Sequence, residues 1–98
     1  MQQQVVDVER VLPYKVYSKA GCIFCDAAMD LLEQKGIEYE EVKVPGNEEA
    51  MNLFKMNRFK TVPQIFTDRD VYIGGYQDLK SKLVDWPENP AETNSFSN

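Results

Sequence analysis

The stretch YKVYSKAGCIFC, residues 14–25, decides the fold of this chain. Its first five residues alternate aromatic or branched side chains with Lys15, and this alternation predicts a β-strand. Lys19 to Gly21 predicts a turn. Cys22 and Cys25 then open a segment whose apolar residues recur with the period of a helix. The stretch therefore predicts a strand, a tight turn and a helix that begins at a Cys-x-x-Cys pair.

The residues that follow complete a strand–helix–strand unit. The helix is expected over residues 23–35, because Cys25, Ala28, Met29 and Leu32 share one face. Gly36 stands where a glycine commonly ends a helix. Alternating residues at 37–44 predict a second strand. Two strands joined by one helix predict a parallel pair with a right-handed crossover.

The second half of the chain carries the signals of a helix, a hairpin and a last helix. These elements are expected at residues 47–56, 64–67, 71–73 and 76–86. Asn47 is a natural N-cap. The last helix presents Leu79, Leu83 and Trp86 on one face, and Pro87 stops it. The order β-α-β-α-β-β-α predicts an α/β fold with one four-stranded mixed sheet flanked by three helices, on both of its faces.

The 98 residues suit one domain. We expect this domain at residues 14–86, an N-terminal extension at 1–13, and a flexible tail at 87–98, which is rich in Pro, Asn and Ser. No apolar run is long enough to cross a membrane, and residues 1–10 lack the pattern of a secretory signal. We therefore expect a cytoplasmic protein, and a monomer.

Charge and missing residue types exclude several functions. The net charge of −5 argues against binding to nucleic acid or to an anionic membrane. The chain has no histidine, which excludes Ser/His and Cys/His hydrolases and a His-ligated zinc site. The two cysteines of one chain cannot complete a four-thiolate zinc site, so no metal site is expected from one chain alone.

The spacing of Cys22 and Cys25 suits reversible disulfide chemistry. Residues three apart on a helix have Cβ atoms about 5–6 Å apart, which allows a disulfide to close with little backbone movement. Cys22 would face the unpaired N–H groups of the helix start, and Lys19 adds a cation, so we expect a thiolate with a pKa of about 3.5–7.5. Cys25 lies on the apolar face and should be buried. Cys22 is thus the predicted nucleophile and Cys25 the resolving thiol.

Two other interpretations of the cysteine pair stay open at this point. The pair could be half of a metal site shared between two chains, or two inert cysteines of the core. The preceding strand, the following helix and the expected reducing compartment favour the redox interpretation.

Three motifs in the same order resemble those of the glutaredoxin family, and together they span most of residues 14–86. They are YSKAGCIFC at 17–25, TVPQIF at 61–66 and IGGYQDL at 73–79. The resemblance is to the dithiol type of glutaredoxin, here with a CIFC active site. It implies a thioredoxin-like fold and a glutathione-disulfide oxidoreductase that uses glutathione to reduce protein disulfides and protein–glutathione mixed disulfides. It also implies a role in electron transport and cell redox homeostasis, with ribonucleotide reductase among the partners to expect.

The same resemblance implies a glutathione-binding set. Its members are Lys19, Phe24, Lys60, Thr61, Val62, Pro63, Gly75, Tyr76, Gln77 and Asp78. Lys19 would meet the glycine carboxylate of glutathione, helped by Lys60, a further cation beside the TVP segment. Val62, before a cis Pro63, would pair its backbone with the cysteine moiety. N–H groups near Gly75 to Asp78 would receive the γ-glutamyl carboxylate, and the Asp78 carboxylate would accept from the ammonium group.

This sequence departs from the commonest family pattern between the cysteines. Ile23 and Phe24 stand where proline and tyrosine are usual. Active sites without that proline sometimes hold an iron–sulfur cluster, so the alternative function is a dimer bridged by a [2Fe–2S] cluster, bound through Cys22 and two glutathiones, that acts as cluster carrier or sensor. A third possibility is a thioredoxin-like reductase supplied by a flavoprotein; Lys19 and the 75–78 segment argue against it.

Overall fold

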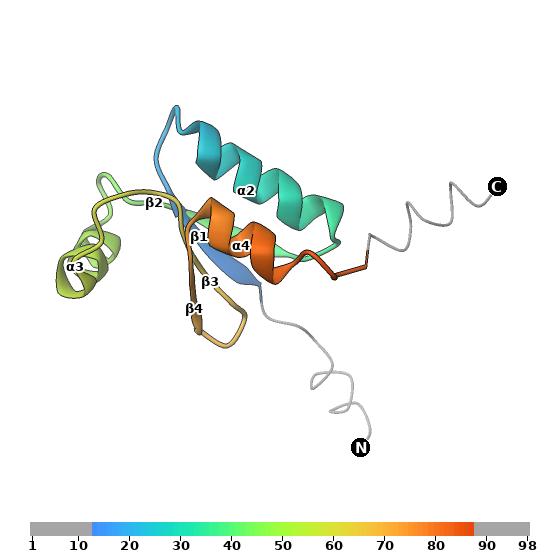
Figure 1. Ribbon diagram of the computed structural model, residues 1–98. Coiled ribbons are helices and arrows are strands. Elements are labelled where there is room, and N and C mark those ends of the chain that lie inside the picture. Colours follow the sequence, from blue (N-terminus) through green and yellow to red (C-terminus); the bar gives the residue numbers. More distant parts are fainter. Residues whose placement is uncertain (1–12, 88–98) are drawn as a thin grey trace, which may run out of the picture.

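The computed structural model describes residues 13–87. Its elements are β1 (Tyr14–Ser18), α2 (Ile23–Gln34), β2 (Tyr39–Lys43), α3 (Glu48–Asn57), β3 (Gln64–Phe66), β4 (Tyr72–Gly74) and α4 (Tyr76–Lys82) (Figure 1). The predicted order β-α-β-α-β-β-α is confirmed. The predicted N-terminal extension and C-terminal tail lie outside the described residues, apart from Pro13 and Pro87. Within the described part, no helix combines the length and apolar character needed to cross a bilayer.

The four strands form one mixed sheet in the order β2-β1-β3-β4. β1 and β2 are parallel, as the strand–helix–strand pattern predicts, and Tyr14 lies beside Tyr39. β3 is antiparallel to both β1 and β4, with Ile65 beside Val16. The sheet thus joins a parallel half to an antiparallel hairpin at the central pair of strands.

One face of the sheet carries the aliphatic core. Alternation along β1 buries Tyr14, Val16 and Ser18, and α2 and α4 lie side by side over this face (Figure 1). The buried cluster consists of Tyr14, Val16, Ala28, Leu32, Ile65, Leu79 and Leu83. Each large aliphatic side chain here contributes about 1.5–3 kcal/mol on burial, so this layer holds α2 and its cysteine pair against the sheet.

The opposite face carries a cluster of aromatic rings that anchors α3. Its members are Tyr17, Phe54, Phe59, Phe66 and Tyr72. The Tyr17 and Phe54 ring centroids are 5.9 Å apart, which ties α3 to β1. Such aromatic pairs contribute about 0.5–1.5 kcal/mol beyond simple burial. Helices therefore cover both faces, as predicted.

Local signals set several helix ends. The Gly36 N–H donates to the Glu33 carbonyl at 3.1 Å and the Ile37 N–H to the Leu32 carbonyl at 2.9 Å. Gly36 has φ +72°, so this is the glycine-dependent end of α2 that the sequence predicts. At the start of α3, the Asn47 side chain accepts from the Ala50 N–H at 3.0 Å, which confirms the predicted N-cap.

The prediction that the last helix reaches residue 86 is wrong. α4 ends at Lys82, and Leu83 is its C-cap with φ −97° and ψ 9°. The Trp86 N–H donates to the Leu83 carbonyl three residues back, in a turn rather than a helix. Pro87 disfavours helical backbone at the residue before it. Leu79 and Leu83 are buried as predicted, but Trp86 is 40% exposed.

Strand boundaries in the hairpin also shift. β3 ends at Phe66 and β4 covers Tyr72–Gly74, one residue beyond the prediction. The Thr67 hydroxyl accepts from the Arg69 and Val71 N–H groups at 3.1 and 3.2 Å, so Thr67 belongs to the turn. The strand predicted over residues 37–44 is likewise shorter in the structure, where β2 covers only Tyr39–Lys43.

Candidate active site at Cys22 and Cys25

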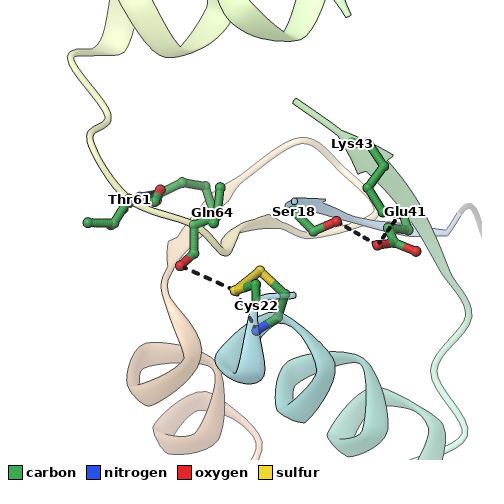
Figure 2. The surroundings of a disulfide bond; sticks show 8 residues. Ser18, Cys22, Glu41, Lys43, Thr61 and Gln64 are labelled. Atoms are coloured by element: carbon green, nitrogen blue, oxygen red, sulfur yellow. Dashed lines mark hydrogen bonds and ion pairs between the residues drawn. A yellow bond between two sulfur atoms is a disulfide. The ribbon is translucent and has the colours of Figure 1, made fainter. Parts of the chain in front are cut away.

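Cys22 and Cys25 form a disulfide at the beginning of α2. Cys22 is the N-cap of the helix and Cys25 lies in its first turn. Their Cα atoms are 5.2 Å apart, within the range that disulfides require. Figure 2 shows the disulfide at the start of α2, facing the segment that carries Thr61 and Gln64. A helix start thus brings both sulfurs together without any unusual backbone.

The two cysteines differ in accessibility. Cys25 is 1% exposed, whereas Cys22 is half-buried. Ile23 and Phe24 between them are 79% and 57% exposed and form an apolar rim. A sulfur on another molecule can therefore approach Cys22 but not Cys25. This asymmetry agrees with the predicted roles of nucleophile and resolving thiol.

Polar groups of the backbone surround the Cys22 sulfur. The Cys25 N–H donates to Cys22 Sγ at 3.1 Å, and the Val62 carbonyl oxygen lies 3.8 Å from the same sulfur. An N–H donor at a helix N-terminus stabilises the ionised form of a sulfur over the neutral form. Val62 precedes Pro63 through a cis peptide bond, as the motif implies.

A groove of about 270 Å³ opens beside the disulfide. It is lined by Phe24, Thr61, Val62, Pro63, Gly75, Tyr76, Gln77 and Asp78. These residues come from α2, from the segment before β3 and from the start of α4. The Phe24 and Tyr76 rings, with centroids 5.9 Å apart, meet across two of these elements. The groove brings together every residue of the predicted glutathione-binding set except the two lysines.

Lys19 and Lys60 lie at a neighbouring cavity. That cavity holds about 260 Å³, and Thr61 and Val62 are the residues it shares with the groove. Both lysine side chains are exposed. The structure therefore places these cations across the Thr61–Val62 segment from the groove rather than inside it.

The start of α4 depends on Asp78 and on a glycine. The Gly75 N–H donates to Asp78 Oδ2 at 3.1 Å. Gly74 has φ +126°, and a Cβ added there would overlap the Asp78 carboxylate. A residue with a side chain at position 74 would thus disturb both the backbone and the position of Asp78. The Asp78 side chain is exposed and faces the groove that it lines.

Two residues that the sequence analysis did not assign to the site support its central segment. The Tyr72 hydroxyl donates to Gln64 Oε1 at 2.6 Å, and Gln64 Nε2 donates to the Thr61 carbonyl at 3.0 Å. Gln64 is 6% exposed. A buried amide needs hydrogen-bond partners, so a glutamine in a short apolar strand was a usable signal. The sequence carries no comparable signal for Tyr72, because its hydrogen bond to Gln64 depends on the pairing of β3 with β4.

A second polar contact lies near the disulfide. The Ser18 hydroxyl, fully buried at the end of β1, donates to Glu41 Oε2 at 2.6 Å. Lys43 Nζ is 3.8 Å from the same carboxylate (Figure 2). In the described part of the chain, no buried side-chain nitrogen or oxygen lacks a hydrogen-bond partner. The polar groups near the cysteines are thus satisfied within the protein.

Comparisons with known proteins agree with this geometry. A family model described as Glutaredoxin matches residues 15–72. The chain is 38% identical over 66 residues to glutaredoxin 3 of Escherichia coli (strain K12), an alignment that covers 66% of this chain and 78% of that protein. It is 37% identical over 67 residues to a probable glutaredoxin of Synechocystis, covering 66% and 75%.

Solved structures show the same architecture. The crystal structure of glutaredoxin 1 from Francisella tularensis complexed with cacodylate matches with a TM-score of 0.63 and 30% identity, covering 74% of this chain and 93% of that one. The crystal structure of a buckwheat glutaredoxin–glutathione complex matches with a TM-score of 0.64 and 26% identity, covering 85% and 76%. The thioredoxin-like arrangement of sheet and helices is thus shared with both.

Proposed function

This chain belongs to the glutaredoxin family and is a thiol–disulfide oxidoreductase, and we propose that glutathione is the reductant it uses on protein disulfides and on protein–glutathione mixed disulfides. The observation that carries the proposal is the groove beside the accessible Cys22 sulfur. Its lining from Val62 and from the Gly75–Asp78 segment offers backbone polar groups and a carboxylate. A γ-Glu-Cys-Gly tripeptide, with its peptide groups, two carboxylates and one ammonium, matches that chemistry.

The proposed reaction is thiol–disulfide exchange at Cys22. The Cys22 thiolate attacks the glutathione sulfur of a mixed disulfide, the old S–S bond breaks, and the protein leaves as a thiolate that takes up a proton. The thiolate of a second glutathione then attacks the Cys22–glutathione disulfide. Glutathione disulfide leaves, and Cys22 is again a thiolate. The two steps together consume one glutathione thiol for each mixed disulfide that is reduced, and the other half of the glutathione disulfide comes from the mixed disulfide itself.

Bound glutathione would lie along the Thr61–Val62 segment. The Val62 backbone would pair with its cysteine moiety, next to the Cys22 sulfur. Its glycine carboxylate would point to Lys19 and Lys60, across this segment. Its γ-glutamyl end would lie against Gly75, Tyr76 and Gln77, with its ammonium on the Asp78 carboxylate. Phe24 would form one wall. The solved complex of a buckwheat relative with glutathione supports this choice of ligand.

Cys25 adds a second route for protein disulfides. After Cys22 has formed a mixed disulfide with a protein, the Cys25 thiolate can attack Cys22 Sγ and release the reduced protein, which leaves the Cys22–Cys25 disulfide seen in the structure. Glutaredoxin couples of this kind have potentials of about −200 to −230 mV. Such a pair works where glutathione keeps it reduced, so we propose that the protein acts in the cytoplasm. We further propose that it acts as a monomer. Ribonucleotide reductase is one partner of the right chemistry to test.

Two cysteine variants test the proposal. With the mixed disulfide of cysteine and glutathione as substrate, Cys22→Ser should abolish glutathione-dependent turnover, because Cys25, the other cysteine, is only 1% exposed. Cys25→Ser should keep most of it, since this substrate needs no resolving thiol. An equal and complete loss in both variants would contradict the assigned roles. Calorimetric titration of glutathione disulfide into Cys25→Ser should show binding; its absence would favour a reductase supplied by a flavoprotein.

One observation favours a second function. Ile23, 79% exposed, stands beside Cys22 where proline is usual, which suits a [2Fe–2S] cluster bound between two chains. Among residues 13–87 no group of three or more metal-ligating Cys, His, Asp or Glu side chains lies together. Each chain would thus supply only Cys22, with glutathione thiolates completing the ligand set. Anaerobic reconstitution with iron, sulfide and glutathione should give a coloured dimer if this function holds, and a colourless protein if it does not.

A further inference from the structure

The residues that flank Cys22 in the chain have no part in holding glutathione as it is placed above. Ala20, Gly21 and Ile23 line neither the glutathione groove nor the cavity next to it. All three residues are exposed, and none of them carries a charge. We call these three residues the flanking surface. The glutathione groove thus accounts for one side of Cys22, and the flanking surface lies on a side that glutathione leaves uncovered.

The two residues between the cysteines serve different sides of the active site. Phe24 lines the glutathione groove, and its ring meets the Tyr76 ring with centroids 5.9 Å apart. Successive residues of an α-helix point about 100° apart around the helix axis. Ile23, the residue before Phe24, therefore points away from the groove, and it is 79% exposed. Its apolar side chain is available to a partner other than glutathione.

The turn before Cys22 leaves room for such a partner. Gly21 has φ +72°, and no heavy atom of the described residues lies within 4 Å of a Cβ built on it. Ala20 beside it has only a methyl side chain. No bulky side chain of this turn therefore blocks a polypeptide that approaches Cys22 over the flanking surface.

The chemistry of the exchange brings the target protein close to this surface. When Cys22 attacks the glutathione sulfur, the target sulfur leaves on the opposite side, two S–S bonds or about 4 Å from Cys22 Sγ. Adjacent residues have Cα atoms about 3.8 Å apart, both for Cys22 and Ile23 and for the target cysteine and its neighbour. A side chain next to the target cysteine can therefore reach Ile23 while glutathione stays in its groove.

We propose that the flanking surface contacts the protein half of a mixed disulfide, and that Ile23 gives this chain a preference for target cysteines with an aliphatic neighbour. This inference rests on the proposed function and names its substrate class. Contact between two aliphatic side chains removes both from water, which favours the complex. Ile23 is thus a specificity residue, and it takes no part in the exchange of sulfurs.

Glutathionylated peptides with blocked ends test the proposal. Acetyl-Ala-Leu-Cys-Leu-Ala-amide should be reduced with a kcat/KM about fivefold above that of acetyl-Ala-Ser-Cys-Ser-Ala-amide. This factor is below the range of about 10–200-fold for one methylene in an enclosed apolar pocket, because the flanking surface is open. Neither peptide carries a charge, so Lys19 and Lys60 do not enter the comparison. The mixed disulfide of cysteine and glutathione serves as the reference substrate.

Matched variants locate the preference on the protein. Ile23→Ser and Ile23→Ala should each lower the ratio of the two kcat/KM values to less than about twofold. A ratio measured within one variant cancels any change in the reactivity of Cys22. Val84→Ser should keep the fivefold ratio, because Val84 is an equally apolar residue, 71% exposed, near the other end of α2. Two residues after it, the Trp86 carbonyl accepts from Lys35 Nζ at 3.0 Å.

The outcomes separate the inference from the proposed function. If the wild type turns over the reference substrate but shows no peptide preference, the flanking surface does not select the target. A preference that survives in both Ile23 variants, or falls equally in Val84→Ser, also overturns the proposal. Ultracentrifugation that shows a dimer which Ile23→Ser dissociates would assign the surface to a second copy of the chain and overturn it as well. If the wild type fails on the reference substrate, the proposed function fails, and this inference with it.

Discussion

Cys22 and Cys25 lie in the same helical turn but face different surroundings. Cys22 is half-buried and its sulfur accepts the Cys25 backbone N–H, while Cys25 is almost fully buried. The difference comes from the helix itself, because Cys22 caps its N-terminus, whereas Cys25 lies on the same buried face as Ala28 and Leu32. Val62, whose carbonyl oxygen is 3.8 Å from Cys22 Sγ, then borders the approach to that sulfur.

At the residue scale we predict that Gln64 supports glutathione binding. Gln64→Leu leaves the Thr61 carbonyl and the Tyr72 hydroxyl without their partner, which frees the Thr61–Val62 segment. Losing interactions worth about 1.4 kcal/mol would raise the KM for glutathione about tenfold, with a smaller change in kcat. Steady-state kinetics will measure both. Gln34→Leu, on an exposed glutamine at the end of α2, should change neither; an effect equal to that of Gln64→Leu would contradict the prediction.

The elements of the fold are joined by a few specific side-chain contacts as well as by packing. The Tyr39 hydroxyl on β2 donates to Glu33 Oε2 at the end of α2 at 2.7 Å. This contact spans the αL turn at Gly36 and supports the return of the chain from helix to strand. It also raises the pKa of Tyr39 to about 12, mainly because the bond to Glu33 favours the protonated phenol, with burial and nearby carboxylates adding to it.

At the element scale this shift predicts a loss of stability at alkaline pH. An unfolded tyrosine has a pKa of about 10, so the contribution of Tyr39 to the free energy of unfolding is fully present below pH 10. It is lost as the pH rises through the folded value of about 12. Urea unfolding should thus show Tyr39→Phe less stable than wild type at pH 8, with the difference shrinking between pH 10 and 12. A difference that does not change over this range would contradict the assignment.

The whole molecule is a sheet between two unlike layers. Aliphatic side chains hold α2 and α4 on one face, and aromatic rings hold α3 on the other. The active site lies where these layers meet the end of the sheet. The start of α4 lines its groove, and α3 lines the neighbouring cavity beside Lys19 and Lys60. The stability of the aliphatic layer therefore determines whether α2 presents its cysteines correctly.

At this scale we predict that Leu83 is essential although it follows the last turn of α4. Leu83 is fully buried and Val84 beside it is 71% exposed. Leu83→Ala should lower the free energy of unfolding by about 2–5 kcal/mol, because it leaves a cavity in the aliphatic core. Val84→Ala should change it by less than about 0.5 kcal/mol. Chemical denaturation of both variants will decide, and equal losses would mean that Leu83 does not close the core.

Much of the fold and the reacting pair can be predicted from the sequence because their signals are local. The spacing of Cys22 and Cys25, the cap at Asn47 and the glycine at position 36 each act on residues within one turn, so sequence neighbours decide the outcome. The three motifs likewise predict the lining of the groove. The roles of these residues in glutathione binding stay predictions until the kinetics are measured.

Other features depend on residues that are distant in sequence, and only the tertiary structure decides them. The end of α4 at Lys82, the support of Thr61 by Gln64 and Tyr72, and the position of Lys19 beside Lys60 all require strands and helices to meet in three dimensions. The cavity beside Lys19 and Lys60 has the same origin, since it forms between the end of β2, α3 and the segment before β3. The physical reason is that hydrogen bonds and burial act over a few ångströms, whichever residues the fold brings within that range.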